Sequence, residues 1–120
     1  MDATQLKART KAFAIRIVKM AERLPRTHAG NAISRQIIRS ATSVAANYRA
    51  ACRGRSRAEF AAKLGIAEEE ADETLFWLEM IGEAGLLRSE QLSSLMAEAD
   101  ELVAIMTASA KTARRRAQAT

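Results

Sequence analysis

The chain has 120 residues, of which 48% are apolar and 28% are charged, so it is long enough for one domain and too apolar to be disordered. One cysteine and one histidine exclude a disulfide framework and are too few for a tetrahedral zinc site. The net charge is +5, no apolar run is long enough to span a membrane, and the single cysteine fits a reducing compartment, so we expect a basic cytoplasmic protein.

Glycine and proline divide the chain into four segments, and alanine, the best helix former, fills 26 positions. Apolar residues recur at helical spacing in every segment. We predict four helices, at about residues 4–23, 31–53, 57–84 and 89–112. Residues 1–113 then form one domain, and residues 114–120 are a basic C-terminal tail.

The residues between the segments are typical of helix ends. Pro25 ends the first helix because proline has no backbone N–H. Asn31 and Ser89 are the expected N-caps of the second and fourth helices. The third helix opens with a Ser56–Glu59 capping box, and Gly85 caps its C-terminus.

Each predicted helix carries one continuous apolar stripe, and the loops between the helices are short. Neighbouring helices must therefore pack antiparallel. The sequence predicts an all-α fold, an up-down-up-down four-helix bundle.

The third helix has a second apolar face, which lies opposite its core stripe. Within a sector of roughly 100° it gathers Ile66, Phe76, Trp77 and Met80. Exposed aromatic and methionine side chains that lie close together are typical of protein–protein surfaces. These four residues are the expected interface of a homo-oligomer, unless a neighbouring helix covers part of the sector.

Charge is unevenly distributed along the chain. Residues 1–57 carry +11, residues 58–110 carry −10 and residues 111–120 carry +4. On the second helix and the loop that follows it, a ridge is formed by Arg35, Arg39, Arg49, Arg53, Arg55 and Arg57. Arginine suits phosphate recognition through its planar fork of donors, so the ridge is a candidate nucleic-acid site. The alternative is that these arginines pair with the acidic residues of segment 68–73.

A polar stripe lies beside the arginines and contains Gln36, Ser40, Ser43 and Asn47. Serine and asparagine are disfavoured inside helices, so these side chains are expected to hydrogen-bond a neighbouring helix or subunit. Asn47 is the leading candidate for a buried amide. Exposure to solvent is the alternative for the whole stripe.

Groups that could carry catalysis are scarce. His28 has no glutamate at the Glu-x-x-His spacing of di-iron bundles, and Cys52 has no histidine partner in the sequence. We predict no catalytic residue, metal, cofactor or small-molecule substrate. The basic first helix is also compatible with an anionic membrane surface, although its apolar stripe is expected to face the bundle core.

The run from Gln36 to Asn47, with the sequence Gln-x-x-Arg-x-x-x-Ser-x-x-x-Asn, is followed by Gly54-Arg55-Ser56 and Glu59-Phe60. This pattern resembles the family of four-helix-bundle proteins encoded in intervening sequences of 23S ribosomal RNA genes. The resemblance implies a small cytoplasmic bundle that often assembles as a homopentameric ring. It also implies a relationship to the accessory proteins of diversity-generating retroelements, basic pentameric barrels that engage nucleic acid and a reverse transcriptase.

The chain departs from this family at residues 48–51, where Tyr-Arg-Ala-Ala replaces a common Ile-Ala-Glu-Gly segment. Two functional hypotheses follow from the sequence. In the first, the protein is a non-enzymatic, self-assembling bundle that binds RNA through its first two helices. In the second, it is a protein-interaction scaffold or accessory subunit with no nucleic-acid role.

Overall fold

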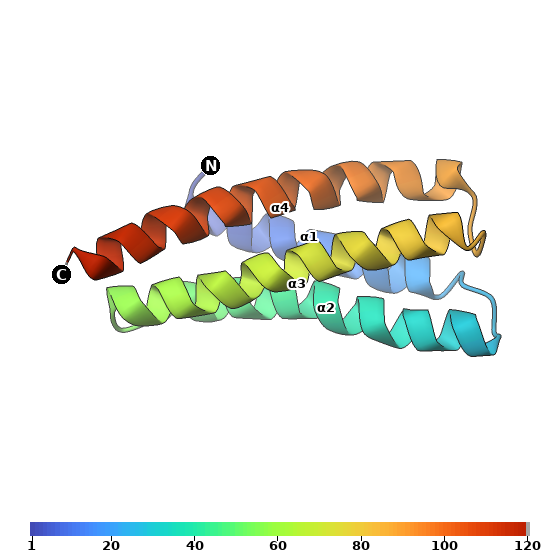
Figure 1. The fold of residues 1–120 in the computed structure, drawn as a ribbon, viewed down its shortest axis with the longest axis horizontal. Coiled ribbons are helices and arrows are strands. Elements are labelled where there is room, and N and C mark those ends of the chain that lie inside the picture. Colours follow the sequence, from blue (N-terminus) through green and yellow to red (C-terminus); the bar gives the residue numbers. More distant parts are fainter. Residues whose placement is uncertain (120) are drawn as a thin grey trace.

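The computed structural model describes residues 1–119, which form four α-helices (Figure 1). They are α1 (Ala3–Ala21), α2 (His28–Cys52), α3 (Arg57–Glu83) and α4 (Ser89–Gln118). Consecutive helices pack antiparallel in a body of 50 × 22 × 21 Å, which confirms the predicted up-down-up-down bundle (Figure 1). None of the described helices combines the length and apolarity needed to cross a membrane.

The first two helices begin with side-chain caps. The Asp2 carboxylate accepts a hydrogen bond from the Gln5 N–H at 2.8 Å, and the Gln5 side chain accepts one from the Asp2 N–H at 2.9 Å. At α2 the cap is Thr27, whose hydroxyl accepts from the Gly30 N–H at 3.1 Å. The prediction of Asn31 as N-cap is therefore wrong, because Thr27 caps the helix one turn earlier.

The last two helices differ from the prediction in one cap each. Ser56 accepts from the Glu59 N–H at 3.1 Å as predicted, but the Glu59 carboxylate accepts from the Arg55 N–H at 2.7 Å, so the capping box is only half formed. At α4 the cap is Arg88, whose N–H donates to the Gln91 side chain at 2.9 Å. Ser89 is the first helical residue and not the N-cap.

The fourth helix corrects the predicted tail at 114–120, because α4 continues to Gln118. The apolar stripe of α4 extends through Ala113, which is buried, and Ala117, which packs against the core. Arg115 and Arg116 in the last turn also interact favourably with the helix dipole. Residue 120 of the predicted tail lies outside the described residues.

The core is a single cluster to which all four helices contribute. Its largest fully buried aliphatic side chains include Ile17, Ile37, Leu64, Leu78 and Leu102. Alanine occupies many of the other buried positions, which allows the helices to approach one another closely.

The four seams of the bundle are unequal. α3 packs extensively on both α2 and α4, whereas α1 packs on α2 and only lightly on α4. The α1–α4 seam is bridged by Arg9, whose guanidinium donates two hydrogen bonds of 2.7 Å to Glu98 and lies 3.1 Å from Glu101. The hydrogen bond from Arg9 is the main reason that the pKa of Glu98 is lowered.

Three buried hydroxyls complete the core: Thr10, Ser40 and Thr74. Thr10 donates to the Leu6 carbonyl of its own helix at 3.0 Å. Ser40 on α2 and Thr74 on α3 lie 2.8 Å apart and form a hydrogen bond between the helices. Ser40 is therefore the member of the polar stripe that makes the predicted contact with a neighbouring helix.

Two glycines of the α3 region have opposite backbone requirements. Gly85 has φ of +69°, and the Leu86 N–H donates to the Ile81 carbonyl as in a Schellman cap. Gly65 is helical, and a methyl group added there would meet no atom within 4 Å. We expect Gly85→Ala to lower the free energy of unfolding by about 1 kcal/mol and Gly65→Ala to raise it by about 0.5–1 kcal/mol. Urea unfolding followed by circular dichroism measures both changes, and changes of the same sign would contradict the two conformations.

Tyr48 is the only tyrosine of the chain and is 5% exposed. Burial, and next the neighbouring Cys52 thiol, raise the pKa of Tyr48 to about 12. Because this value lies above the unfolded value of about 10, the resulting stability is complete below pH 10 and is lost as the pH rises towards 12. Ultraviolet absorbance of the phenolate follows this group alone. The Tyr48→Phe variant should therefore lose less stability between pH 10 and pH 12 than the unaltered protein. A phenolate absorbance midpoint near pH 10 in the folded protein would contradict the burial of Tyr48.

Candidate nucleic-acid interface

Arg39 lies in the middle of the predicted arginine ridge and is engaged within the chain. Its Nη1 donates to Glu70 on α3 at 2.9 Å, and its Nη2 pairs with Glu73. The hydrogen bond to Glu70 is the main reason that the pKa of Arg39 is raised. For this residue the structure shows the alternative interpretation, in which the ridge is neutralised by the acidic segment.

The other ridge residues are exposed: Arg35, Arg49, Arg53, Arg55 and Arg57. Among residues 1–119, no carboxylate forms an ion pair with any of them. Arg57 donates at 3.5 Å to the backbone carbonyl of Arg116 on α4. The structure does not bring the six together, because Arg35 lies in the first turns of α2 and Arg53, Arg55 and Arg57 lie at the far end of that helix and beyond it.

The antiparallel arrangement instead creates a basic end. The last turn of α2, the loop after it and the last turns of α4 lie at the same end of the bundle (Figure 1). Six arginines from the α2–α3 loop, the first residue of α3 and the last turns of α4 form what we call the basic end: Arg53, Arg55, Arg57, Arg114, Arg115 and Arg116. Arg114 is partly neutralised by Glu68 on α3, at 3.7 Å. Sequence reasoning missed the contribution of α4 because it assigned residues 114–120 to a separate tail.

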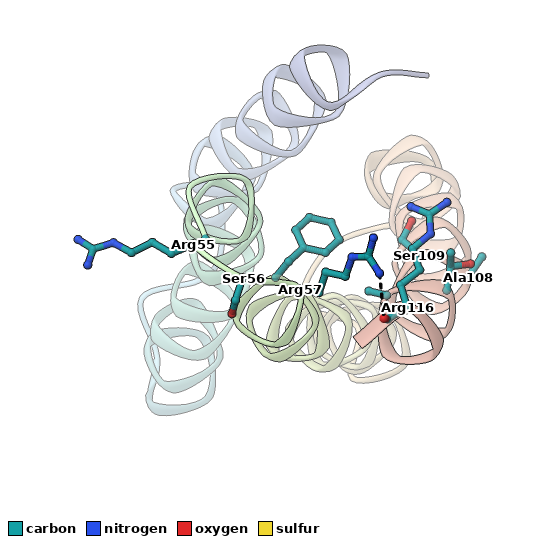
Figure 2. A pocket seen from close by; sticks show the side chains of 10 residues that line it. Arg55, Ser56, Arg57, Ala108, Ser109 and Arg116 are labelled. Carbon is teal, nitrogen blue, oxygen red and sulfur yellow. Dashed lines mark hydrogen bonds between the residues drawn. The ribbon is translucent and has the colours of Figure 1, made fainter. Parts of the chain in front are cut away.

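A hollow of about 790 Å³ opens at the basic end, between the start of α3 and the last turns of α4. Arg57 reaches across it towards Arg116, while Arg55 points away from the bundle (Figure 2). The α4 side also contributes the hydroxyl side chains Ser109 and Thr112. Guanidinium and hydroxyl donors in a concave surface are suited to phosphate oxygens.

The polar stripe does not form a shared site. Gln36 is exposed, and Asn47 is half-buried. The Asn47 amide donates to the Ser43 carbonyl and to the Ser43 hydroxyl, both at 2.9 Å and both within α2. The Asn47 amide is thus hydrogen-bonded, but it is half-buried and not fully buried as expected, and its partner lies one turn back in α2 and not on a neighbouring helix.

Residues that could carry chemistry stay apart. Cys52 is a half-buried free thiol at the end of α2, and His28 is exposed at the start of that helix. Within residues 1–119, no three His, Cys, Asp or Glu side chains are grouped closely enough to hold a metal ion.

The second apolar face of α3 is exposed at three of its four positions. Ile66 is 39%, Phe76 47% and Met80 37% exposed, and we call these three residues the α3 patch. Trp77 is half-buried against the core, where its Nε1 donates to Glu73 at 3.2 Å. Its ring meets Phe76 edge to face, with the centroids 4.9 Å apart. Trp77 thus belongs partly to the core, whereas the patch itself faces outward.

A second exposed apolar surface was not expected from the sequence. A groove of about 450 Å³, the α1–α2 groove, runs between the outer faces of these helices. It is lined by Lys7, Ala8, Lys11, Ala14, Ile15, Val18, Thr42, Ala45, Ala46 and Arg49. Ile15 is 48% exposed. The sequence signal for the groove was the position of Ile15, which lies outside the core stripe of its helix.

Comparison with known proteins identifies relatives over most of the chain. The family model described as "23S rRNA-intervening sequence protein" matches residues 4–108. A crystal structure from Bacteroides thetaiotaomicron, described as a protein with unknown function from the S23 ribosomal protein family, is 35% identical, with a TM-score of 0.84. The similarity covers 92% of this chain and 99% of that one. No curated protein matches the chain.

Proposed function

Because this chain belongs to the 23S rRNA-intervening sequence protein family, we propose that it is a non-enzymatic cytoplasmic bundle that assembles with copies of itself and binds RNA or another nucleic acid. The observation that carries the nucleic-acid role is the basic end, where six arginines from three segments of the chain gather. Phosphate contacts of this kind supply affinity without sequence readout.

The basic end supports this role better than the ridge along α2 does. Arg39 in the middle of the ridge is already bound by Glu70 and Glu73, so its charge is compensated. Arg53 and Arg55 have no ion pair in the described part of the chain and stay exposed. Exposed, uncompensated guanidinium groups attract a polyanion most strongly.

The resemblance to the accessory proteins of diversity-generating retroelements favours the same role, and that relationship and the pentameric ring are part of the proposal. A membrane role is less favoured. The apolar residues that α1 would insert into lipid, such as Phe13, Ile17 and Met20, are buried in the bundle.

The second hypothesis, a scaffold without a nucleic-acid role, is favoured by a different observation. The α3 patch exposes three large apolar side chains on one helix face. Such a surface is suited to a protein partner. Both hypotheses include self-assembly, and they differ in whether the basic end has a ligand.

A salt titration with a structured RNA hairpin separates the two hypotheses. We expect fluorescence anisotropy to show binding that weakens steeply between about 50 and 200 mM KCl. The double variant Arg53→Glu/Arg55→Glu should bind at least tenfold more weakly, with a salt slope smaller by about two.

The matched control is Arg23→Glu/Arg26→Glu, which changes the net charge equally at the opposite end of the bundle. This control should retain most of the affinity. Equal losses in both variants would show an effect of overall charge and not of the basic end. No binding by the unaltered protein at low salt would remove the nucleic-acid role and leave the scaffold hypothesis.

A further inference from the structure

We propose that the α1–α2 groove of one copy receives the α3 patch of a second copy, so that subunits join head to tail. This inference rests on the self-assembly in the proposed function and assigns the two surfaces that carry it. It follows from the shape of the groove, from the charges around both surfaces and from their lengths.

The groove is shaped to accept a helix. Four of its ten lining residues are alanines, two on α1 and two on α2. Small side chains allow the backbone of a second helix to approach closely. Ile15 and Val18 add apolar surface at one end, so a helix seated there would cover groups that now face water.

Charge identifies which helix fits. The groove is bordered by Lys7, Lys11 and Arg49, and none of them forms an ion pair within residues 1–119. The outward face of α3 carries four exposed acids around the α3 patch: Glu69, Asp72, Glu79 and Glu83. These acids also form no ion pair within the described chain. An apolar groove with a basic border therefore matches an apolar patch with an acidic border.

The α3 surface is long enough to fill the groove. The groove extends from Lys7 to Val18 on α1, which is eleven residue steps or about 16 Å at 1.5 Å per residue. The α3 patch and its acids extend from Ile66 to Glu83, which is seventeen steps or about 26 Å. The whole groove can thus be covered by one straight stretch of α3.

The same charges disfavour a symmetric dimer. An α3–α3 contact about a two-fold axis would place two sets of Glu69, Asp72, Glu79 and Glu83 against each other. A groove–groove contact about a two-fold axis would likewise place two sets of Lys7 and Lys11 against each other. Since each copy offers one groove and one patch on different helices, the contact is heterologous and repeats from copy to copy, as in a ring.

Charge reversal at the two surfaces tests the assignment through the native mass from light scattering. The unaltered protein should have a native mass of two or more times the 13.1 kDa of one chain. Lys7→Glu/Lys11→Glu and Glu69→Lys/Glu79→Lys should each reduce the mass to that of a monomer at the same concentration. The quadruple variant, in which both surfaces are reversed, should regain the mass of the unaltered protein.

Two further variants control for overall charge and for folding. Lys19→Glu/Arg23→Glu changes the charge of α1 and its C-terminal loop beyond the groove and should leave the mass unchanged. Ile15→Asp places a charge inside the groove at an exposed position, so it should break the assembly while circular dichroism shows an intact bundle.

The outcomes separate this inference from the proposed function. A monomeric unaltered protein would overturn self-assembly and this inference together. An oligomer that survives both Lys7→Glu/Lys11→Glu and Ile15→Asp would overturn the α1–α2 groove as the interface and leave self-assembly standing. Two reversed variants that dissociate, without recovery in the quadruple variant, would show that the two surfaces do not face each other.

Discussion

Antiparallel packing of helices joined by short loops is the constraint on which the rest of this structure depends. The connecting segments, residues 22–27, 53–56 and 84–88, are too short for any other arrangement of neighbours. Packing in this way brings segments that are far apart in the sequence to a common end. The basic end exists for this reason, since its arginines come from both sides of an acidic segment of the chain.

The opposite charges of the two halves only partly neutralise each other. Arg9 and Arg39 form close pairs across helix seams, with Glu98 and Glu101 and with Glu70 and Glu73. Most of the other charged side chains lie on the outer faces of the helices, with basic residues along the α1–α2 groove and acidic residues along α3. Surfaces of opposite sign within one subunit favour contacts between copies and disfavour symmetric ones.

Most of the fold was predictable, because helix spacing, turn residues and loop lengths are local properties of the sequence. The ends of helices were less predictable where two residues compete for one role. Thr27 and Asn31 are both suitable N-caps by residue type, and the structure begins α2 at His28, so the Thr27 hydroxyl takes the role. The tail was misjudged because the three arginines at 114–116 conceal the continuation of the apolar stripe through Ala113 and Ala117.

The candidate site was less predictable than the fold because it depends on contacts between helices. The sequence shows that Arg39 and Glu70 have opposite charges, but only the packing of α2 on α3 shows that they meet. The light α1–α4 seam is a feature of the same kind. α1 has one well-packed neighbour where α3 has two, and it packs less extensively on that neighbour than α4 does on α3. We therefore expect the amides of α1 to exchange with solvent ahead of those of α3.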